Sequence, residues 1–267
     1  MPSTACLTLD LEPDHAGRAA FDYEAWRSDR LDSLMDLLAE FKAPLSAFVV
    51  GKSLEQQPGA IARLRERGVE FHLHSYSHNL AEPDSAAEID AGMRVFEATF
   101  GHRPLGYRAP EGRISEGGMQ RLAERRFLFD SSVFPSAWPH PRYLRHPRVA
   151  YRAQPSNLLE IPVATAGRAR LPVTLSFIKL LGFPLYRRLI RTGRIPNPLV
   201  FDLHLHDLFV LPAFDQLPAF LKVAYSRNRR EGPALLRATL ALLRDSGFSF
   251  TTMTTTARAL DQTLPRC

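Results

Sequence analysis

The sequence of 267 residues contains two cysteines, Cys6 and Cys267. Two cysteines so far apart do not build the disulfide framework of small secreted proteins, and no motif around either one indicates a catalytic thiol. A chain of this length buries a large core without such covalent links. We therefore expect a protein that folds without disulfides in a reducing compartment.

Long apolar runs are also missing. The longest apolar stretch, 171–186, is interrupted by Pro172, Lys179 and Pro184, whereas a membrane span needs ~20 mostly apolar residues. Residues 1–4 lead directly into an apolar segment without a basic region before it, so we expect no secretion signal. These features predict a cytoplasmic protein without a membrane-spanning helix.

Acidic residues are outnumbered by basic ones. The 34 lysines and arginines exceed the 28 aspartates and glutamates, which gives a formal net charge of +6. Such an excess suits an anionic partner. Because no aromatic–basic strand motif and no helix-turn-helix pattern accompanies it, we do not expect nucleic acid to be that partner.

The segment 171–198 is apolar in its first half and basic in its second. One interpretation is a barrel helix with a solvated basic end. The other is an insertion that forms an amphipathic helix and lies peripherally on an anionic inner-membrane surface. The sequence leaves both open. The cations of the segment are Lys179, Arg187, Arg188, Arg191 and Arg194.

Predicted strands and helices alternate along the chain. Apolar runs predict strands at 5–11, 45–50, 69–73, 127–129, 158–163, 199–205 and 248–252, and helical spacing predicts helices at 28–41, 58–67, 85–100, 115–126 and 233–245. This alternation is typical of parallel βαβ units. We predict a single α/β domain over 1–267, a distorted (β/α)7 barrel that is either closed or incomplete, with its chemistry at the carboxyl ends of the strands.

Polar side chains stand at those predicted strand ends. Asp10 and Glu12 follow the first strand, at positions i and i+2 on one side of an extended segment. His74 and His78 follow the third strand and could meet one cation if the segment turns helically. Two imidazoles and one carboxylate leave a coordination position open, as catalytic zinc sites do.

Three further polar motifs are weak when taken singly. Arg108 lies in Gly-Tyr-Arg-Ala-Pro-Glu-Gly, Asp130 begins Asp-Ser-Ser, and His204 and His206 alternate in Asp-Leu-His-Leu-His-Asp. An Asp-Ser-Ser segment is often only a turn or a helix cap. Histidines on an apolar strand are often core residues.

Taken in order, these motifs resemble the five-motif pattern of the polysaccharide deacetylase family, also called the NodB-homology family or carbohydrate esterase family 4. The quoted segments are T-L-D-L-E (8–12), H-S-Y-S-H (74–78), R-A-P-E-G (108–112), D-S-S (130–132) and L-H-D (205–207). The resemblance covers about residues 5–253 and implies the NodB-homology fold.

The resemblance implies a divalent metal held by Glu12, His74 and His78. The family's common first motif has two adjacent aspartates, and here Leu11 separates Asp10 from a glutamate. Asp14 is therefore an alternative carboxylate ligand. The ligand types suit Zn²⁺, with Co²⁺, Ni²⁺ and Mn²⁺ as alternatives.

It also implies catalytic roles for four residues. Asp10 resembles the general base, and Arg108 the group that orients it. Asp130 resembles the residue that orients the catalytic histidine, and His206 the general acid. His204 competes with His206, and we prefer His206 because an aspartate follows it as in the family pattern.

The implied activity is metal-dependent removal of an N-acetyl group from an amino sugar, which yields acetate and a free amine. With the basic segment 171–198, we expect a lipid-linked or precursor glycan, for example one carried on a polyprenyl phosphate, at the cytoplasmic face. Alternatives are hydrolysis of another linear C–N bond, by a deformylase of a lipid-linked amino sugar or a ureide hydrolase, and an inactive scaffold of the same fold.

Overall fold

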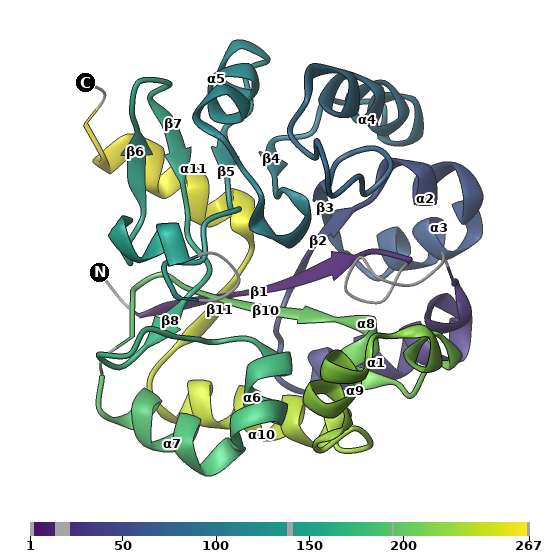
Figure 1. The fold of residues 1–267 in the computed structure, drawn as a ribbon, viewed down its shortest axis with the longest axis vertical. Coiled ribbons are helices and arrows are strands. Elements are labelled where there is room, and N and C mark those ends of the chain that lie inside the picture. Colours follow the sequence, from purple (N-terminus) through teal and green to yellow (C-terminus); the bar gives the residue numbers. More distant parts are fainter. Residues whose placement is uncertain (1–2, 14–21, 138–140, 194, 266–267) are drawn as a thin grey trace.

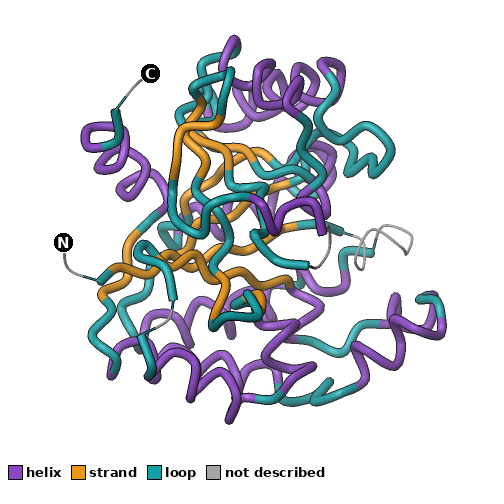
Figure 2. Tube along the Cα trace, turned by 60° about the vertical axis from the view of Figure 1, so that its left-hand side comes forward, coloured by secondary structure: helices purple, strands orange, loops and turns teal. Residues whose placement is uncertain are grey.

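The computed structural model describes residues 3–13, 22–137, 141–193 and 195–265. Its main sheet has the strand order β10-β1-β2-β3-β4-β5-β7-β6, with β11 pairing the start of β1. Every pairing in this sheet is parallel except that of β6 with β7. The sheet curls, and helices lie outside it (Figures 1 and 2).

The strands of the described chain are β1 Thr4–Leu11, β2 Leu45–Val49, β3 Glu70–Leu73, β4 Gly106–Tyr107, β5 Phe129–Asp130, β6 Tyr151–Ala153, β7 Leu158–Glu160, β8 Thr165–Ala166, β9 Leu171–Pro172, β10 Leu199–His204 and β11 Ser249–Thr251. Its α-helices are α1 Ser28–Glu40, α2 Gly51–Gln56, α3 Pro58–Glu66, α4 Ala86–Phe100, α5 Glu116–Glu124, α6 Leu175–Leu181, α7 Phe183–Arg191, α8 Leu205–Leu208, α9 Ala219–Ser226, α10 Gly232–Asp245 and α11 Met253–Thr263.

The predicted fold class is confirmed. Parallel strands alternate with helices, and the sheet is a curled, incomplete barrel because no ladder joins β10 to β6 within the described residues. Every strand and helix predicted above is present, with ends shifted by a few residues. The helices α2, α8, α9 and α11 and the short strands β4, β6, β8 and β9 were not predicted.

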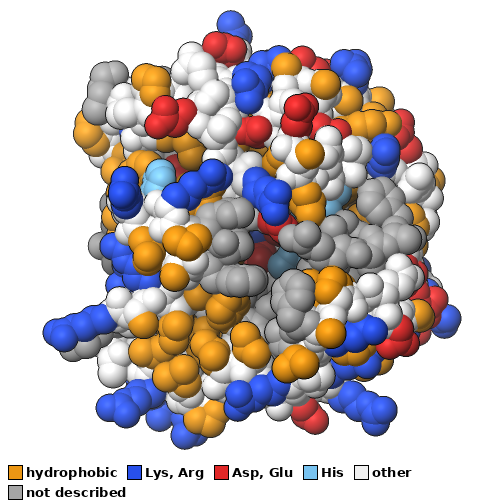
Figure 3. Space-filling model, viewed as in Figure 1, with side chains coloured by type: hydrophobic (Ala, Val, Ile, Leu, Met, Phe, Trp, Pro, Cys, Tyr) orange, Lys and Arg blue, Asp and Glu red, His pale blue; other side chains and the backbone are white. Residues whose placement is uncertain are grey.

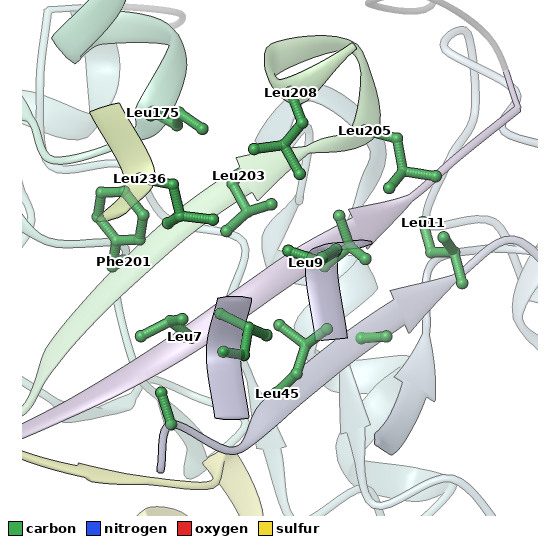
Figure 4. Packing of buried hydrophobic residues seen from close by; sticks show 14 of the residues in the cluster. Leu7, Leu9, Leu11, Leu45, Leu175, Phe201, Leu203, Leu205, Leu208 and Leu236 are labelled. Atoms are coloured by element: carbon green, nitrogen blue, oxygen red, sulfur yellow. The ribbon is translucent and has the colours of Figure 1, made fainter. Parts of the chain in front are cut away.

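The alternation of β1 determines which side chains face the site. Leu7, Leu9 and Leu11 point to the outer face of the sheet and pack with Leu203 of β10 and Leu236 of α10 (Figure 4). Each fully buried leucine of this kind contributes roughly 1.5–3 kcal/mol to stability. Since successive side chains of a strand alternate, the residues between these leucines face the interior of the barrel.

The segment 171–198 is not a single helix. It contains β9 and the two helices α6 and α7, which meet at Gly182 with a φ of +95°. Ile178 and Tyr186 bury one side of each helix in the core. No helix in the described parts of the chain has the length and apolarity needed to cross a membrane.

At the end of the barrel opposite the strand carboxyl ends, one acid, Glu70, contacts several segments of the chain. Glu70 accepts hydrogen bonds from the Ser46 hydroxyl at 2.7 Å and the Thr254 amide at 3.2 Å, and lies 2.9 Å from His72 Nε2. Ser46 in turn accepts from the amide of Met253. Burial opposes ionisation, but the bonds to His72 and the neighbouring donors lower the pKa of Glu70 to about 2.

Replacing Glu70 with glutamine is expected to lower the free energy of unfolding by about 1–3 kcal/mol at neutral pH. Because the pKa of Glu70 is depressed on folding, its contribution is complete above about pH 4.5 and is lost as pH falls toward about 2. The difference in unfolding free energy between wild type and variant, measured by denaturant titration, should therefore become smaller as the pH is lowered. The exposed Glu66→Gln is the control. A difference that does not depend on pH would contradict the assignment.

Candidate metal and catalytic site

The site begins where β1 leaves the sheet. Asp10 pairs with His204 in the ladder between β1 and β10, and Glu12 follows one residue beyond the strand. Both carboxylates are almost entirely buried, with 5% and 8% exposure. Their i, i+2 spacing therefore places both on the interior side, as the sequence predicted.

The two histidines of the H-S-Y-S-H segment converge by a different route from the helical turn considered above. Residues 74–78 form a loop after β3, in which Ser75 and His78 both have a φ of +58°. Left-handed backbone is unfavourable for such residues, so surrounding contacts must hold the loop. The Ser75 hydroxyl accepts a hydrogen bond from the His78 amide at 3.1 Å.

Glu88 of α4 supplies most of the remaining support for this loop. Its carboxylate accepts hydrogen bonds from the amides of Tyr76 and Ser77 at 3.0 and 2.7 Å, and from the Ser77 hydroxyl at 2.6 Å. One carboxylate thus satisfies three donors of a loop that makes no ladder of its own. Its effect is to fix the direction in which His78 leaves the backbone.

Replacing Glu88 with alanine is expected to weaken metal binding about 10–100-fold, a loss typical when a ligand's supporting contacts are removed. The physical reason is that the loop would relax out of its left-handed conformation. Zn²⁺ affinity measured by competition with a chelator checks this. Glu97→Ala, on the exposed side of the same helix, is the matched control, and an unchanged affinity in Glu88→Ala would refute the argument.

Glu12, His74 and His78 form a cluster in which the ligand atoms all lie within 4.8 Å of one another. The Glu12 carboxylate lies 2.9 Å from His78 Nε2 and 3.6 Å from His74 Nε2. Burial opposes ionisation of Glu12, but the adjacent His78 and His204 rings hold its pKa well below the ordinary value. The carboxylate is therefore in the form that binds a cation.

The donor atoms fit a divalent metal. The Nδ1–H of His74 donates to the carbonyl of Arg108 at 2.7 Å, so its Nε2 presents a lone pair. That Nε2 and Glu12 Oε1 are buried without a hydrogen-bond partner in the described parts of the chain. Buried polar atoms are normally satisfied, and a cation would satisfy both. The alternative ligand Asp14 lies outside the described residues.

Arg108 is fully buried and contacts Asp10, the predicted general base. Its NH1 donates to Asp10 at 2.7 Å, to Asp202 at 2.6 Å and to the Thr8 hydroxyl at 3.0 Å. Burial raises the pKa of Asp202 to about 6, with the nearby Asp10 charge adding to the effect and Arg108 opposing it. One guanidinium thus serves two acids in the barrel interior.

Both candidate histidines lie beside the carboxylates. His204 Nε2 is 3.8 Å from Asp10 Oδ2 and 3.9 Å from Glu12 Oε1, and its Nδ1 is 3.4 Å from Asp207. His206 stacks on His204 at 4.6 Å and approaches Glu12 Oε1 at 4.0 Å. The side chain of His204 is 21% exposed and that of His206 is 3%. His204 is therefore the ring that reaches both carboxylates and the surface.

The electrostatics of His204 follow from its neighbours. Burial lowers its pKa, but the charges of Glu12, Asp202 and Asp10 and the contact with Asp207 outweigh burial, so its pKa is raised well above the ordinary value. The pKa of Asp207 is lowered despite its burial, chiefly by His204. Asp207 also accepts a hydrogen bond from the His204 amide at 3.0 Å, which fixes the start of α8.

Asp130 ends β5 and is fully buried. It accepts hydrogen bonds from the Ser132 hydroxyl at 2.7 Å and the Ser132 amide at 3.3 Å, and pairs with Glu160. Asp207 lies 3.4 Å from the Nδ1 of His204. The role of Asp130 in orienting the catalytic histidine stays a prediction.

The cluster opens to one face of the molecule. Figure 3 shows acidic and histidine side chains at the bottom of a hollow near the centre of this face. Sequence reasoning assigned no supporting role to the acids Asp202, Asp207, Glu88 and Glu160. A signal existed for Asp202, because it stands two residues before His204 and so shares its strand face. No comparable signal exists for Glu88, which acts from a neighbouring helix.

Known proteins resemble part of this chain in sequence. Residues 5–125 match the family model for polysaccharide deacetylase. The peptidoglycan deacetylase-like protein FGM2 of Gibberella zeae is 32% identical over 90 residues, covering 32% of this chain and 27% of that protein. The peptidoglycan-N-acetylmuramic acid deacetylase PdaC of Bacillus subtilis is 26% identical over 111 residues, covering 40% and 23%. The matches thus span about a quarter of each relative.

Solved structures resemble it over its whole length. PuuE allantoinase superposes with a TM-score of 0.66 at 17% identity, over 99% of this chain and 93% of that chain. The PdaC structure superposes with a TM-score of 0.52 at 16% identity, over 98% and 93%. At such identities the likeness concerns the fold. Residues 5–125 therefore match the polysaccharide deacetylase family in sequence, and the whole chain shares the fold of these solved structures.

Proposed function

We propose that this protein is a metal-dependent hydrolase that removes an N-acetyl group from an amino sugar. The observation that carries the proposal is the convergence of the ligand atoms of Glu12, His74 and His78 within 4.8 Å. Asp10 lies near this cluster, because it and Glu12 approach the same His204 ring at 3.8 and 3.9 Å. Two imidazoles and one carboxylate are a ligand set of catalytic zinc sites, which keep a position open for water or substrate. When bound, such an ion supplies Lewis-acid activation of an amide carbonyl and of water.

The chain's own residues supply the proton transfers. Asp10, held by Arg108, is the base that accepts a proton from the attacking water. An amide nitrogen cannot leave as an anion at neutral pH, so a general acid must protonate it. We assign this role to His204 rather than His206, because His204 lies nearest Asp10 and reaches the surface, with Asp207 behind it.

Metal content and reaction products test this assignment together. The purified protein should bind one Zn²⁺ or Co²⁺ per chain and release acetate from N-acetylated amino sugars, and His74→Ala should lose the metal. Formate or ammonia in place of acetate would favour the deformylase or the ureide hydrolase. Bound metal without turnover on any of these substrates would favour an inactive scaffold.

We further propose that the substrate is a lipid-linked or precursor glycan, such as one on a polyprenyl phosphate, met at the cytoplasmic face of the membrane. The support is the surface of α6 and α7. Leu185 is 38% exposed, and Arg187, Arg188 and Arg191 stand exposed on the same helix. Figure 3 shows apolar side chains gathered over the region of α6, α7 and β8, on the face that holds the hollow.

An amphipathic surface of this kind suits an anionic bilayer. Apolar side chains enter the boundary of the acyl chains while arginines meet lipid phosphates, and the cytoplasmic leaflet carries the anionic lipid. Because the apolar patch and the hollow share one face, docking would bring the site to the membrane surface. A glycan anchored by its lipid would then reach the Glu12, His74 and His78 cluster while the lipid stays in the bilayer.

Vesicle co-sedimentation tests the membrane contact. The protein should bind vesicles that contain phosphatidylglycerol and not vesicles of phosphatidylcholine alone. Arg187→Glu combined with Arg188→Glu should abolish binding, whereas Arg65→Glu with Arg258→Glu, the same charge change on α3 and α11, should not. An equal loss of vesicle binding in both double variants would show only an effect of net charge. That outcome would refute the proposed membrane-binding surface and leave the proposed hydrolase activity unaffected.

A further inference from the structure

Glu160 is a buried acid that the chemistry above does not use. It ends β7 directly opposite Asp130 in the parallel ladder between β5 and β7, and both residues are fully buried. Their buried carboxyl groups interact, and this interaction contributes to the pKa of each. A hydrogen bond between two carboxyl groups requires a proton on one of them, because two carboxylates can only repel each other.

The contacts show which acid keeps the proton. Burial raises the pKa of both groups, but the Asp130 charge raises that of Glu160 further, to well above its ordinary value. Asp130 accepts two hydrogen bonds from Ser132, which favour its ionised form. Glu160 Oε1 accepts from the Val133 amide at 3.0 Å, so Oε2, which is buried with no other partner in the described residues, is the oxygen left to carry the proton and offer it to Asp130.

We propose that Glu160 and Asp130 are positioning residues for the metal ligand His74, with Glu160 as a neutral acid that holds a single negative charge on Asp130 behind Ser132. This inference rests on the proposed metal site. It differs from the role that the family resemblance implies for Asp130, which concerns the catalytic histidine.

A continuous chain of hydrogen bonds connects the acid pair to His74. The Ser132 hydroxyl donates to Asp130 at 2.7 Å and accepts from the amide of Ala109 at 2.8 Å. The carbonyl of the same peptide group, that of Arg108, accepts from His74 Nδ1 at 2.7 Å. One peptide plane is therefore held on its N–H by Ser132 and on its C=O by the imidazole.

The direction of every bond in this chain is fixed. A serine hydroxyl has one proton, so donating to Asp130 leaves only lone pairs for the Ala109 amide. A carbonyl can only accept, so His74 must carry its proton on Nδ1. Hydrogen bonds in series polarise one another, and a carboxylate behind a ligating histidine fixes its tautomer and raises its basicity. Here the carboxylate acts through a serine and a peptide bond.

Zn²⁺ affinity separates this role from a general contribution to stability. Ser132→Ala and Glu160→Ala should weaken Zn²⁺ binding about 10–100-fold. Glu160→Gln should keep wild-type affinity, because its amide donates to Asp130 and accepts from Val133 as the neutral acid does. Glu70→Gln, at the opposite end of the barrel, is the control that should lower stability and leave affinity unchanged.

The metal-free protein provides a second readout. Its infrared spectrum should contain the carbonyl band of a buried protonated carboxylic acid, and Glu160→Gln should remove that band. Wild-type affinity in Ser132→Ala, or a loss in Glu160→Gln as large as in Glu160→Ala, would overturn the inference. A wild-type protein that binds no Zn²⁺ would instead refute the proposed function, so the two failures are distinguishable.

Discussion

Asp10→Asn is expected to lower kcat by roughly 10²–10⁴-fold, the loss typical when a general base is removed, while the metal stays bound. Asp10 is buried beside the Glu12 cluster but is not one of the three converging ligands. Asparagine keeps the shape and still accepts from Arg108, which donates to Asp10 Oδ1 at 2.7 Å. What it loses is the ability to accept a proton.

The measurement pairs steady-state kinetics with metal analysis of the same protein sample. Glu12→Gln is the matched control, since it also replaces a buried carboxylate with its amide but should lose the metal. Loss of metal in Asp10→Asn would make Asp10 a ligand. Normal turnover with metal retained would remove it from the reaction altogether.

Sequence reasoning predicted that Glu12, His74 and His78 lie together, because residue type and strand position suffice for that step. In a parallel barrel the carboxyl ends of the strands meet at one rim, so Asp10, Glu12, His74 and His78 had to come together once the strands were recognised. The backbone conformation of the 74–78 loop could not be predicted in this way. Ser75 and His78 adopt a positive φ without glycine or asparagine to signal it, and the acid that supports them lies on a helix.

The limits elsewhere have the same physical origin. Asp130 lies at a predicted strand end. Its neighbour Glu160 lies on β7, which follows β6 in the chain but also pairs with β5. Local sequence pattern does not show which strands pair with each other. The helix α11 contains three successive threonines, which are weak helix formers, and its amino end is held by the distant Glu70. In each case a contact between segments far apart in sequence decides the local structure.

The choice between His204 and His206 yields the second large effect. His204→Asn is expected to lower kcat roughly 10²–10⁴-fold, because the departing amine would find no proton donor. His206→Asn should cost much less, since His206 packs against His204 and Tyr225 and its ring is almost fully buried. Metal content should be unchanged in both variants, because neither ring belongs to the Glu12 cluster.

A substrate with a better leaving group identifies the acid directly. The phenolate released from an aryl acetate needs no proton to depart, so His204→Asn should hydrolyse such an ester at nearly the wild-type rate. Asp10→Asn should remain impaired on both substrates, because attack by water still needs its base. If His206→Asn shows the selective rescue and His204→Asn does not, the acid is His206, and the shorter approach of His204 to Asp10 serves only to hold that carboxylate in place.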